Sequence, residues 1–332
     1  MIDSRITTTL DLQRDGKQFG HLQIPHSSNT SGWGSVLLPM MVVKRGTGPT
    51  ALLIGGNHGD EYEGPIALLK LAQELDPATL SGRVIILPSL NHPAVLSGTR
   101  LSPLDGRNMN RLFPGRRDGS VSEMIAHYVY HGLLPEADVV VDLHSGGSSM
   151  IFTPCAVIHR LEDRAQQAAC LAAGQAFGAP ILLVLRELDR QGMLDTAAED
   201  MGKVFVSTEL GGGGFLTPST LHVAERGLRN ILRHFAILPG QPEGDTSRLM
   251  ATPEHGAYEM AWVDGLYEPL YEVGSEVSAG DTLGRIYDPD RPANAPMVIT
   301  ANLDGVLITR AGRGQVRRGD TIAVLASDIE GV

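Results

Sequence analysis

Cysteine and long apolar runs are scarce in this chain. Its 332 residues include only 2 Cys, Cys155 and Cys170, which are too few for a disulfide framework or a four-thiolate zinc site. We expect two small buried thiols in a reducing compartment. No apolar run approaches the ~20 residues that cross a membrane, and the polar residues 1–20 lack the layout of a signal peptide. The sequence therefore predicts a soluble, cytoplasmic protein with no membrane partner.

Basic residues are also fewer than acidic ones. The chain has 27 Lys+Arg against 38 Asp+Glu, a formal net charge of −11. This balance argues against a nucleic-acid partner or an anionic membrane surface. It does not exclude a small anionic ligand, because a pocket responds to its local charges. Arg100, Arg107 and Arg111 form a local basic cluster suited to such an anion.

The length predicts about two domains, at roughly 150 residues per domain. We expect a catalytic domain over residues 1–240, a linker rich in Pro and Gly over 241–256, and a β domain over 257–332. Residues 1–45 are expected to form antiparallel strands. Two of them, 5–12 and 18–24, would make a hairpin around Asp15-Gly16 and be followed by a strand at 35–44.

From residue 50 onward, short apolar runs alternate with helical patterns, which is typical of βαβ units and a mainly parallel sheet. Strands are predicted at 51–54, 84–87, 139–143, 181–185 and 204–208. Helices are predicted at 65–75, 122–134, 161–177 and 219–234. A capping box of Ser120 with Glu123 marks the start of the second helix.

A weak repeat, V-x-x-G-D-T-[L/I], occurs at 277–283 and 316–322. It indicates a small β-barrel or sandwich of two similar halves, which resembles the biotinyl/lipoyl carrier fold. A carrier needs an attachment lysine, but the only lysines are outside this region: Lys17, Lys44, Lys70 and Lys203. Carrier function is therefore excluded. We expect the domain to be structural, to shape the pocket or to provide a homo-oligomer contact.

Three predicted strands end at residues that can bind a metal or carry protons. His58 and Glu61 follow the strand at 51–54, His144 follows 139–143, and Glu209 follows 204–208. Open parallel sheets bind ligands beyond the carboxyl ends of their strands. Two imidazoles and one carboxylate are a common catalytic zinc set with a fourth position left for water. We predict one zinc ion at His58, Glu61 and His144, on the strength of this convergence rather than of the weak H-x-x-E spacing.

Glu209 is the predicted general base, since a carboxylate beside a metal-activated water can take its proton. An N-cap or salt-bridge role is the alternative. Asp142 is expected to point to the other face of its strand and to support the site structurally. A second group, Glu123, His127 and His131, shares one helical face, but the capping box already accounts for Glu123, so no metal is expected there.

The loop at 100–115 is dense in arginine and asparagine. Arginine presents a planar fork that suits a carboxylate or the oxyanion formed when water attacks a carbonyl. A surface loop with solvated charges is the alternative.

Taken together, four segments resemble the succinylglutamate desuccinylase/aspartoacylase family, relatives of the zinc carboxypeptidases. The segments are G-N-H-G-D-E at 56–61, N-M-N-R-L-F-P-G at 108–115, D-L-H at 142–144 and T-E-L-G at 208–211. The resemblance covers about residues 45–240 and extends to the C-terminal β domain. It implies a three-layer α/β/α sandwich with a mixed, mainly parallel sheet, plus a small C-terminal all-β barrel or sandwich.

The resemblance also implies residue roles. The zinc ligands would be His58, Glu61 and His144, with Glu209 as the base. The pair Asn110 and Arg111 would hold the substrate carboxylate.

By the same resemblance, Arg100 would polarise the scissile carbonyl, with Arg107 as its competitor. Aspartoacylase uses a further arginine to read a side-chain carboxylate. Arg186 and Arg190 lie in the right region but in no matching motif, which counts against an acidic amino-acid substrate. The family also contains deacetylases of N-acetylated diamino acids in ectoine breakdown, with a similar length and domain plan.

We therefore expect zinc-dependent deacylation of a small anionic N-acyl amino acid, of the N-acetyl diamino acid, N-acetylaspartate or N-succinylglutamate type. One alternative is a metallocarboxypeptidase that acts on peptides. Another is a non-catalytic protein that binds a metal or a carboxylate.

Overall fold

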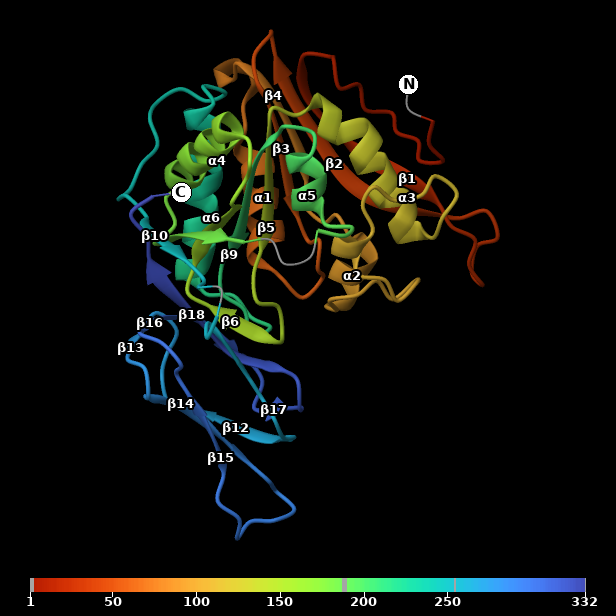
Figure 1. Ribbon diagram of the computed structural model, residues 1–332. Coiled ribbons are helices and arrows are strands. Elements are labelled where there is room, and N and C mark those ends of the chain that lie inside the picture. The colour runs from red at the N-terminus through yellow and green to blue at the C-terminus, as the bar shows by residue number, and fades with distance from the viewer. Residues whose placement is uncertain (1–2, 187–189, 254, 332) are drawn as a thin grey trace.

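The computed structural model describes residues 3–186, 190–253 and 255–331 (Figure 1). A large mixed sheet runs through the molecule in the order β1-β2-β4-β3-β5-β9-β7-β8-β10-β18-β16-β13. Its strands up to residue 209 are β1 Gly16–Pro25, β2 Ser35–Arg45, β3 Thr50–Gly55, β4 Gly82–Leu87, β5 Val139–His144, β7 Cys155–His159, β8 Ile181–Leu185 and β9 Val204–Glu209. The five strands predicted from apolar runs are confirmed, and β4-β3-β5-β9 are parallel neighbours.

Helices cover both faces of this sheet. They are α1 Glu63–Glu74, α2 His92–Ser97, α3 Val121–Tyr128, α4 Arg164–Phe177, α5 Leu194–Glu199 and α6 Pro218–His234. Alternate strand residues point to opposite faces. Leu53 therefore packs with α1, α4 and α6, whereas Leu52 packs with α3 and α5. The predicted three-layer α/β/α sandwich is confirmed.

Two local predictions need correction. Residues 5–12 do not form a strand: β1 pairs along its whole length with β2, and on its other edge only Thr7 bridges to Gln23. Side chains bind the backbone here instead: Ile6 N–H donates to Ser4 Oγ and Leu10 N–H to Thr8 Oγ1. Such local bonds compete with a strand ladder.

The helix predicted at 122–134 ends early. The capping box of Ser120 with Glu123 is present at its start. After Tyr128, however, the chain widens into a π-helical turn, Val129–Leu133.

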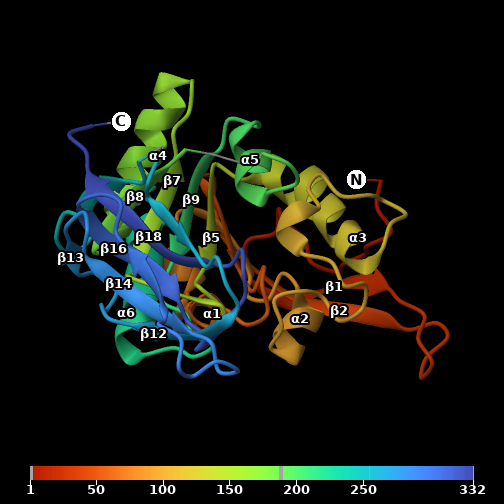
Figure 2. The ribbon, with the colours of Figure 1, turned by 60° about the horizontal axis from the view of Figure 1, so that its bottom comes forward.

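The C-terminal strands are β10 Arg248–Ala251, β11 Tyr258–Met260, β12 Gly265–Pro269, β13 Glu276–Val277, β14 Thr282–Tyr287, β15 Met297–Thr300, β16 Gly305–Ala311, β17 Gln315–Val316 and β18 Thr321–Asp328. Four of them form a separate antiparallel sheet in the order β15-β14-β12-β17. This sheet shares a core with β16 and β18, as expected of a small all-β sandwich. Figure 2 shows these strands on one side of the molecule and β1 and β2 on the other.

The repeat corresponds to two matching turns. Ser278 N–H donates to Asp281 Oδ2 at 2.9 Å, and Arg317 N–H donates to Asp320 Oδ2 at 2.8 Å. The glycine before each aspartate has a positive φ, +94° and +95°. The two turns connect β13 to β14 and β17 to β18.

The C-terminal strands also join the first part of the chain. β10 pairs with β8, and the short strand β6, Met150–Phe152, pairs with β16. We keep the division at residues 241–256 as a proposal about folding units. No helix in the described residues is long and apolar enough to cross a membrane.

Candidate active site

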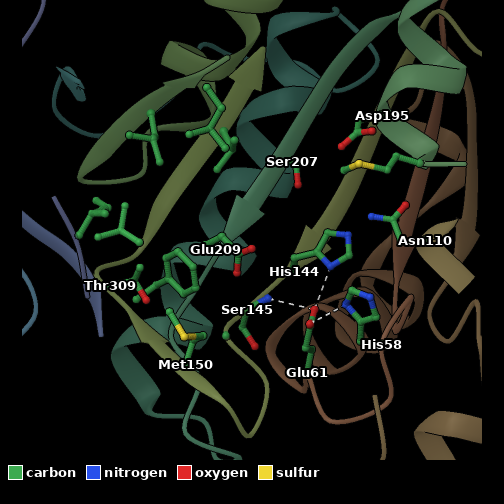
Figure 3. A pocket seen from close by; sticks show the side chains of 18 of the residues that line it. His58, Glu61, Asn110, His144, Ser145, Met150, Asp195, Ser207, Glu209 and Thr309 are labelled. Atoms are coloured by element: carbon green, nitrogen blue, oxygen red, sulfur yellow. Dashed lines mark hydrogen bonds and ion pairs between the residues drawn. The ribbon is translucent and has the colours of Figure 1, made fainter. Parts of the chain in front are cut away.

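The ends of three parallel strands bring the predicted site residues together. β3 ends at Gly55, and the turn after it carries His58 and Glu61 into α1. β5 ends at His144 and β9 ends at Glu209, and these two residues are paired in the sheet register. All four side chains line one cavity of about 550 Å³ (Figure 3). The predicted convergence of these residues is confirmed as geometry.

The carboxylate of Glu61 lies between the two imidazole rings. Its Oε1 is 2.7 Å from His58 Nδ1, and its Oε2 is 2.9 Å from His144 Nδ1. Ser145 N–H also donates to Oε2, at 3.1 Å. Figure 3 shows the rings and the carboxylate facing one another. The three residues are buried, and one ligand atom from each lies within 4.8 Å of the others.

The outer nitrogen of each ring is held by an oxygen acceptor. His58 Nε2 donates to Asn108 Oδ1 at 3.0 Å, and His144 Nε2 donates to Asp142 Oδ2 at 2.8 Å. With the proton on Nε2, each neutral ring directs the lone pair of Nδ1 toward Glu61. Two lone pairs and a carboxylate that face one another need protons or a cation between them. Outer-shell acceptors of this kind are typical of metal-ligating histidines.

Asp142 does not lie where the sequence predicted. Side chains two residues apart in a strand share a face, so Asp142 points to the same side of β5 as His144. Its Oδ2 also accepts a hydrogen bond from Asn57 Nδ2 at 2.9 Å. The prediction that Asp142 points to the opposite face of β5 was wrong. Its predicted role as a supporting group fits this geometry.

The close approach of the charged groups in the site shifts the pKa values of Glu61 and His144. Burial alone would raise the pKa of Glu61, but His58 and His144 lower it well below its usual range. Burial alone would lower the pKa of His144, but Asp142 and Glu61 raise it well above its usual range. The arrangement therefore favours positive charge beside the Glu61 carboxylate, whether as protons or as a metal ion.

Glu209 is partly buried, and its Oε2 is a buried atom without a hydrogen-bond partner. Burial raises the pKa of Glu209 to about 8, and the charge of Glu61 adds to this rise. A cation held by the histidines would lower this pKa again by attraction. A carboxyl group that can gain or lose a proton near neutral pH suits general acid–base work. The alternative salt-bridge role is not seen in the described residues.

Only some residues of the arginine-rich loop line the cavity. Arg100, Asn110 and Arg111 line it. Arg100 Nη1 lies 3.4 Å from Glu61 Oε1 and 3.3 Å from His58 Nδ1. Asn110 is fixed, because its Oδ1 accepts from Leu194 N–H at 2.8 Å. Arg107 is exposed and lies outside the cavity lining, so the geometry favours Arg100 over Arg107 for contact with a bound molecule.

The other arginine candidates are also outside the lining. Arg186 and Arg190 are exposed, and Arg190 pairs with Asp200 at 2.8 Å. On α3 and the turn after it, the rings of His127 and His131 contact each other in a tilted arrangement, with centroids 4.4 Å apart. Within the part of the chain that is described, the only three-residue group with metal-binding geometry is His58, Glu61 and His144.

The C-terminal strands close one side of the cavity. Its lining includes Tyr258 of β11, Thr309 of β16 and Thr321 of β18. Residues of β7 and β8 and Asp195 of α5 also line the cavity. A cavity of this size suits a small molecule.

Several residues of the site were missed by sequence reasoning. Asn108, which holds His58 Nε2, lies within the quoted N-M-N-R segment, whereas the lining residues Ser207, Asp195 and His159 have no motif. Ser207 lies two positions before Glu209 on β9, so strand alternation could have indicated it. Asp195 and His159 come from segments without a readable pattern.

Comparison with known proteins adds three matches. A family model for the succinylglutamate desuccinylase/aspartoacylase catalytic domain matches residues 47–235. A Halomonas elongata protein named N-alpha-acetyl-L-2,4-diaminobutyric acid deacetylase is 46% identical over 329 residues, which cover 98% of this chain and 96% of that protein. The product-bound ectoine utilization protein EutE (DoeB) from Ruegeria pomeroyi has a TM-score of 0.95 at 47% identity, over 98% of this chain and 99% of that chain.

A further solved structure carries a different activity in its name. A succinylglutamate desuccinylase from Silicibacter sp. TM1040 has a TM-score of 0.96 at 47% identity, over 99% of this chain and 100% of that chain. Relatives of equal similarity are thus named for removal of an acetyl and of a succinyl group.

Proposed function

The chain belongs to the succinylglutamate desuccinylase/aspartoacylase family of deacylases, and from this premise we propose that it hydrolyses the amide of a small N-acyl amino acid at a zinc ion. The proposed metal ligands are His58, Glu61 and His144, with one zinc per chain. The observation that carries the proposal is the meeting of these ligands with Glu209 in one cavity.

The donor set fits zinc. Two imidazole nitrogens and a carboxylate converge, and Asn108 and Asp142 hold the outer ring nitrogens. A bound zinc ion would activate water and polarise the acyl carbonyl. The remaining steps fall to side chains of the cavity.

Glu209 is the proposed general base and acid. Its carboxylate would take the proton of the attacking water and return it to the departing amine nitrogen. Its raised pKa and its lack of a fixed partner at Oε2 support this role. A carboxylate that only capped a helix or paired with a cation would have that partner.

Arg100, Asn110 and Arg111 are proposed to bind the substrate. Arg100 lies beside Glu61 and would stabilise the oxyanion of the attacked carbonyl. Asn110 and Arg111 would orient the carboxylate of the amino acid. Arginine pairs with carboxylates in a bidentate manner, which fixes orientation as well as charge.

The substrate we propose is an N-acetylated diamino acid. In the described lining, the only arginines are Arg100 and Arg111, so no third arginine is left there to read an acidic side chain. The Halomonas elongata relative is named for an N-acetyl diaminobutyrate. The cavity volume of about 550 Å³ supports a small substrate over the chain of a peptide, the preference of a metallocarboxypeptidase.

A panel of N-acetyl and N-succinyl amino acids, scored by amine release, tests this proposal. Activity should appear with N-acetyl amino acids, disappear on treatment with a chelator and return with added zinc. Cleavage of C-terminal peptides in place of the panel would favour the carboxypeptidase. Bound zinc without hydrolysis of any compound would favour a non-catalytic binder.

A further inference from the structure

Asp195 is an acidic side chain in the cavity that none of the proposed steps uses. It lies in the first turn of α5 and is only 8% exposed. Figure 3 shows it on the same side of the cavity as Ser207 and Asn110, away from Glu61. Buried carboxylates are costly unless they are paired or hydrogen-bonded, so the partners of this one are informative.

The two carboxylate oxygens of Asp195 differ in their hydrogen-bond partners. Oδ1 accepts from Thr196 N–H at 2.6 Å, and Thr196 Oγ1 lies 3.4 Å from it. For Oδ2, the described residues supply no donor within hydrogen-bond distance, and His159 Nε2 is 4.0 Å away. One oxygen is therefore held by the backbone while the other can accept from a molecule in the cavity.

His159 is a basic neighbour of Asp195: its Nε2 lies 4.0 Å from Oδ2, at the limit for an ion pair but too far for a hydrogen bond. His159 is engaged by Glu199, whose carboxylate oxygens lie 3.0 and 3.1 Å from His159 Nδ1. No lysine or arginine of the described residues forms an ion pair with Asp195. Burial raises the pKa of Asp195, an effect that His159 and the Thr196 N–H reduce and the charge of Glu199 increases. A cation placed beside Oδ2 would relieve this cost.

The backbone ties Asp195 to the proposed carboxylate site. Leu194, its preceding residue, donates its N–H to Asn110 Oδ1 at 2.8 Å. Asn110 and Arg111 therefore stand next to the turn that carries Asp195. An amino acid whose carboxylate is bound by Asn110 and Arg111 would bring its side chain or its nitrogen close to Asp195.

From this arrangement we propose that Asp195 is a specificity-determining residue, whose carboxylate binds the free side-chain ammonium of an N-acetylated diamino acid. The inference rests on the proposed function. Acetylation removes the charge of one nitrogen, whereas the second amine remains an ammonium with three N–H donors at neutral pH. Arg111 and Asp195 would then read the two opposite charges of the substrate from neighbouring positions.

A purely structural role for Asp195 makes a different prediction. If its carboxylate served only to hold Thr196 N–H and the start of α5, its loss would weaken hydrolysis of every substrate alike. A role in ammonium recognition affects only substrates that carry the ammonium. The substrate dependence of the effect therefore separates the two.

The experiment compares Nα-acetyl-2,4-diaminobutyrate with N-acetylnorvaline, in which a methyl group replaces the ammonium at nearly the same volume. The wild-type protein should prefer the ammonium compound. In D195N, kcat/KM for that compound should fall about 10- to 100-fold, the usual range for loss of a hydrogen bond to a charged group. The fall should appear mainly in KM, and hydrolysis of N-acetylnorvaline should stay the same or improve.

D200N is the matched control, because Asp200 is an exposed aspartate just after α5 that pairs with Arg190. It should leave both substrates unaffected. Equal use of both substrates by the wild-type protein would overturn the inference while leaving the deacylase proposal intact, and this measurement needs no variant. An equal loss for both substrates in D195N would also overturn it. Hydrolysis of neither compound by the wild-type protein, nor of any N-acyl amino acid in the panel, would instead overturn the proposed function itself.

Discussion

Asp142 and His144 lie on the same face of β5, and the Asp142 carboxylate accepts a hydrogen bond from His144 Nε2 at 2.8 Å. This bond keeps the proton on the outer nitrogen and turns Nδ1 toward Glu61. The same carboxylate oxygen accepts from Asn57, which lies in the turn that also carries His58 and Glu61. One buried aspartate thus connects the two chain segments that supply the proposed metal ligands.

We therefore predict that D142N weakens metal binding. An amide can present its N–H group to His144 Nε2, which would disfavour the tautomer with a free Nδ1. Loss of an outer-shell partner typically costs about 10–100-fold in metal affinity or activity. Zinc affinity, measured by competition with a chelator, should fall in this range, while D200N keeps the wild-type value. Wild-type affinity in D142N would show that the bond does not orient the ligand.

The sequence was informative where structure is local and the apolar pattern is continuous. Buried parallel strands give unbroken apolar runs, so β3, β5 and β9 could be recognised. Because such strands end at one sheet edge, the positions of His144 and Glu209 followed from topology. The capping box of Ser120 is likewise a contact between residues three apart.

Other features depend on contacts that the sequence does not encode locally. The segment at 5–12 has a strand-like pattern, but only Thr7 of it bridges to β1, at Gln23. Asp195 enters the cavity on a six-residue helix, too short to show periodicity. Closure of the cavity by Thr309 depends on the pairing of β16 with β6, between residues more than 150 positions apart.

The second prediction concerns the turn between His58 and Glu61. A Cβ atom at Gly59 would lie 2.0 Å from the backbone carbon of Ala94 and 2.1 Å from its oxygen. G59A must therefore push the turn away from α2 and move His58. A misplacement of about 1 Å can cost about 100-fold in rate, so we expect a loss of that order in turnover, together with reduced zinc content.

G32A is the control for this change, because nothing lies within 4 Å of a Cβ at Gly32. Metal analysis and steady-state kinetics of the two purified variants provide the comparison. Normal zinc content and turnover in G59A would mean that the tight packing of this turn does not position His58.

Arg111 and Arg107 offer a paired test of carboxylate binding. Arg111 lines the cavity next to Asn110, whereas Arg107 lies four residues earlier, exposed and outside the lining. R111A should raise KM about 10- to 100-fold, as expected for loss of a hydrogen bond to a charged group. R107A should change KM little. A larger effect from R107A would reassign the carboxylate site to the outer part of the loop.

Glu209 provides the sharpest test of the proposed chemistry, because its carboxylate can be altered without changing its size. E209Q should retain zinc, since the metal set consists of His58, Glu61 and His144. It should also fold normally, because Oε2 of Glu209 has no hydrogen-bond partner to lose. Turnover should nevertheless fall by about 10²–10⁴, the usual contribution of general acid–base catalysis.

E225Q is the matched control, as Glu225 forms an ion pair with Lys70 and neither residue lines the cavity. Zinc content, melting temperature and kcat would be measured on both proteins. Full zinc occupancy with a large loss of kcat in E209Q alone separates proton transfer from metal binding. Wild-type kcat in E209Q would assign the base to another group of the cavity, whereas loss of zinc in that variant would make Glu209 a ligand.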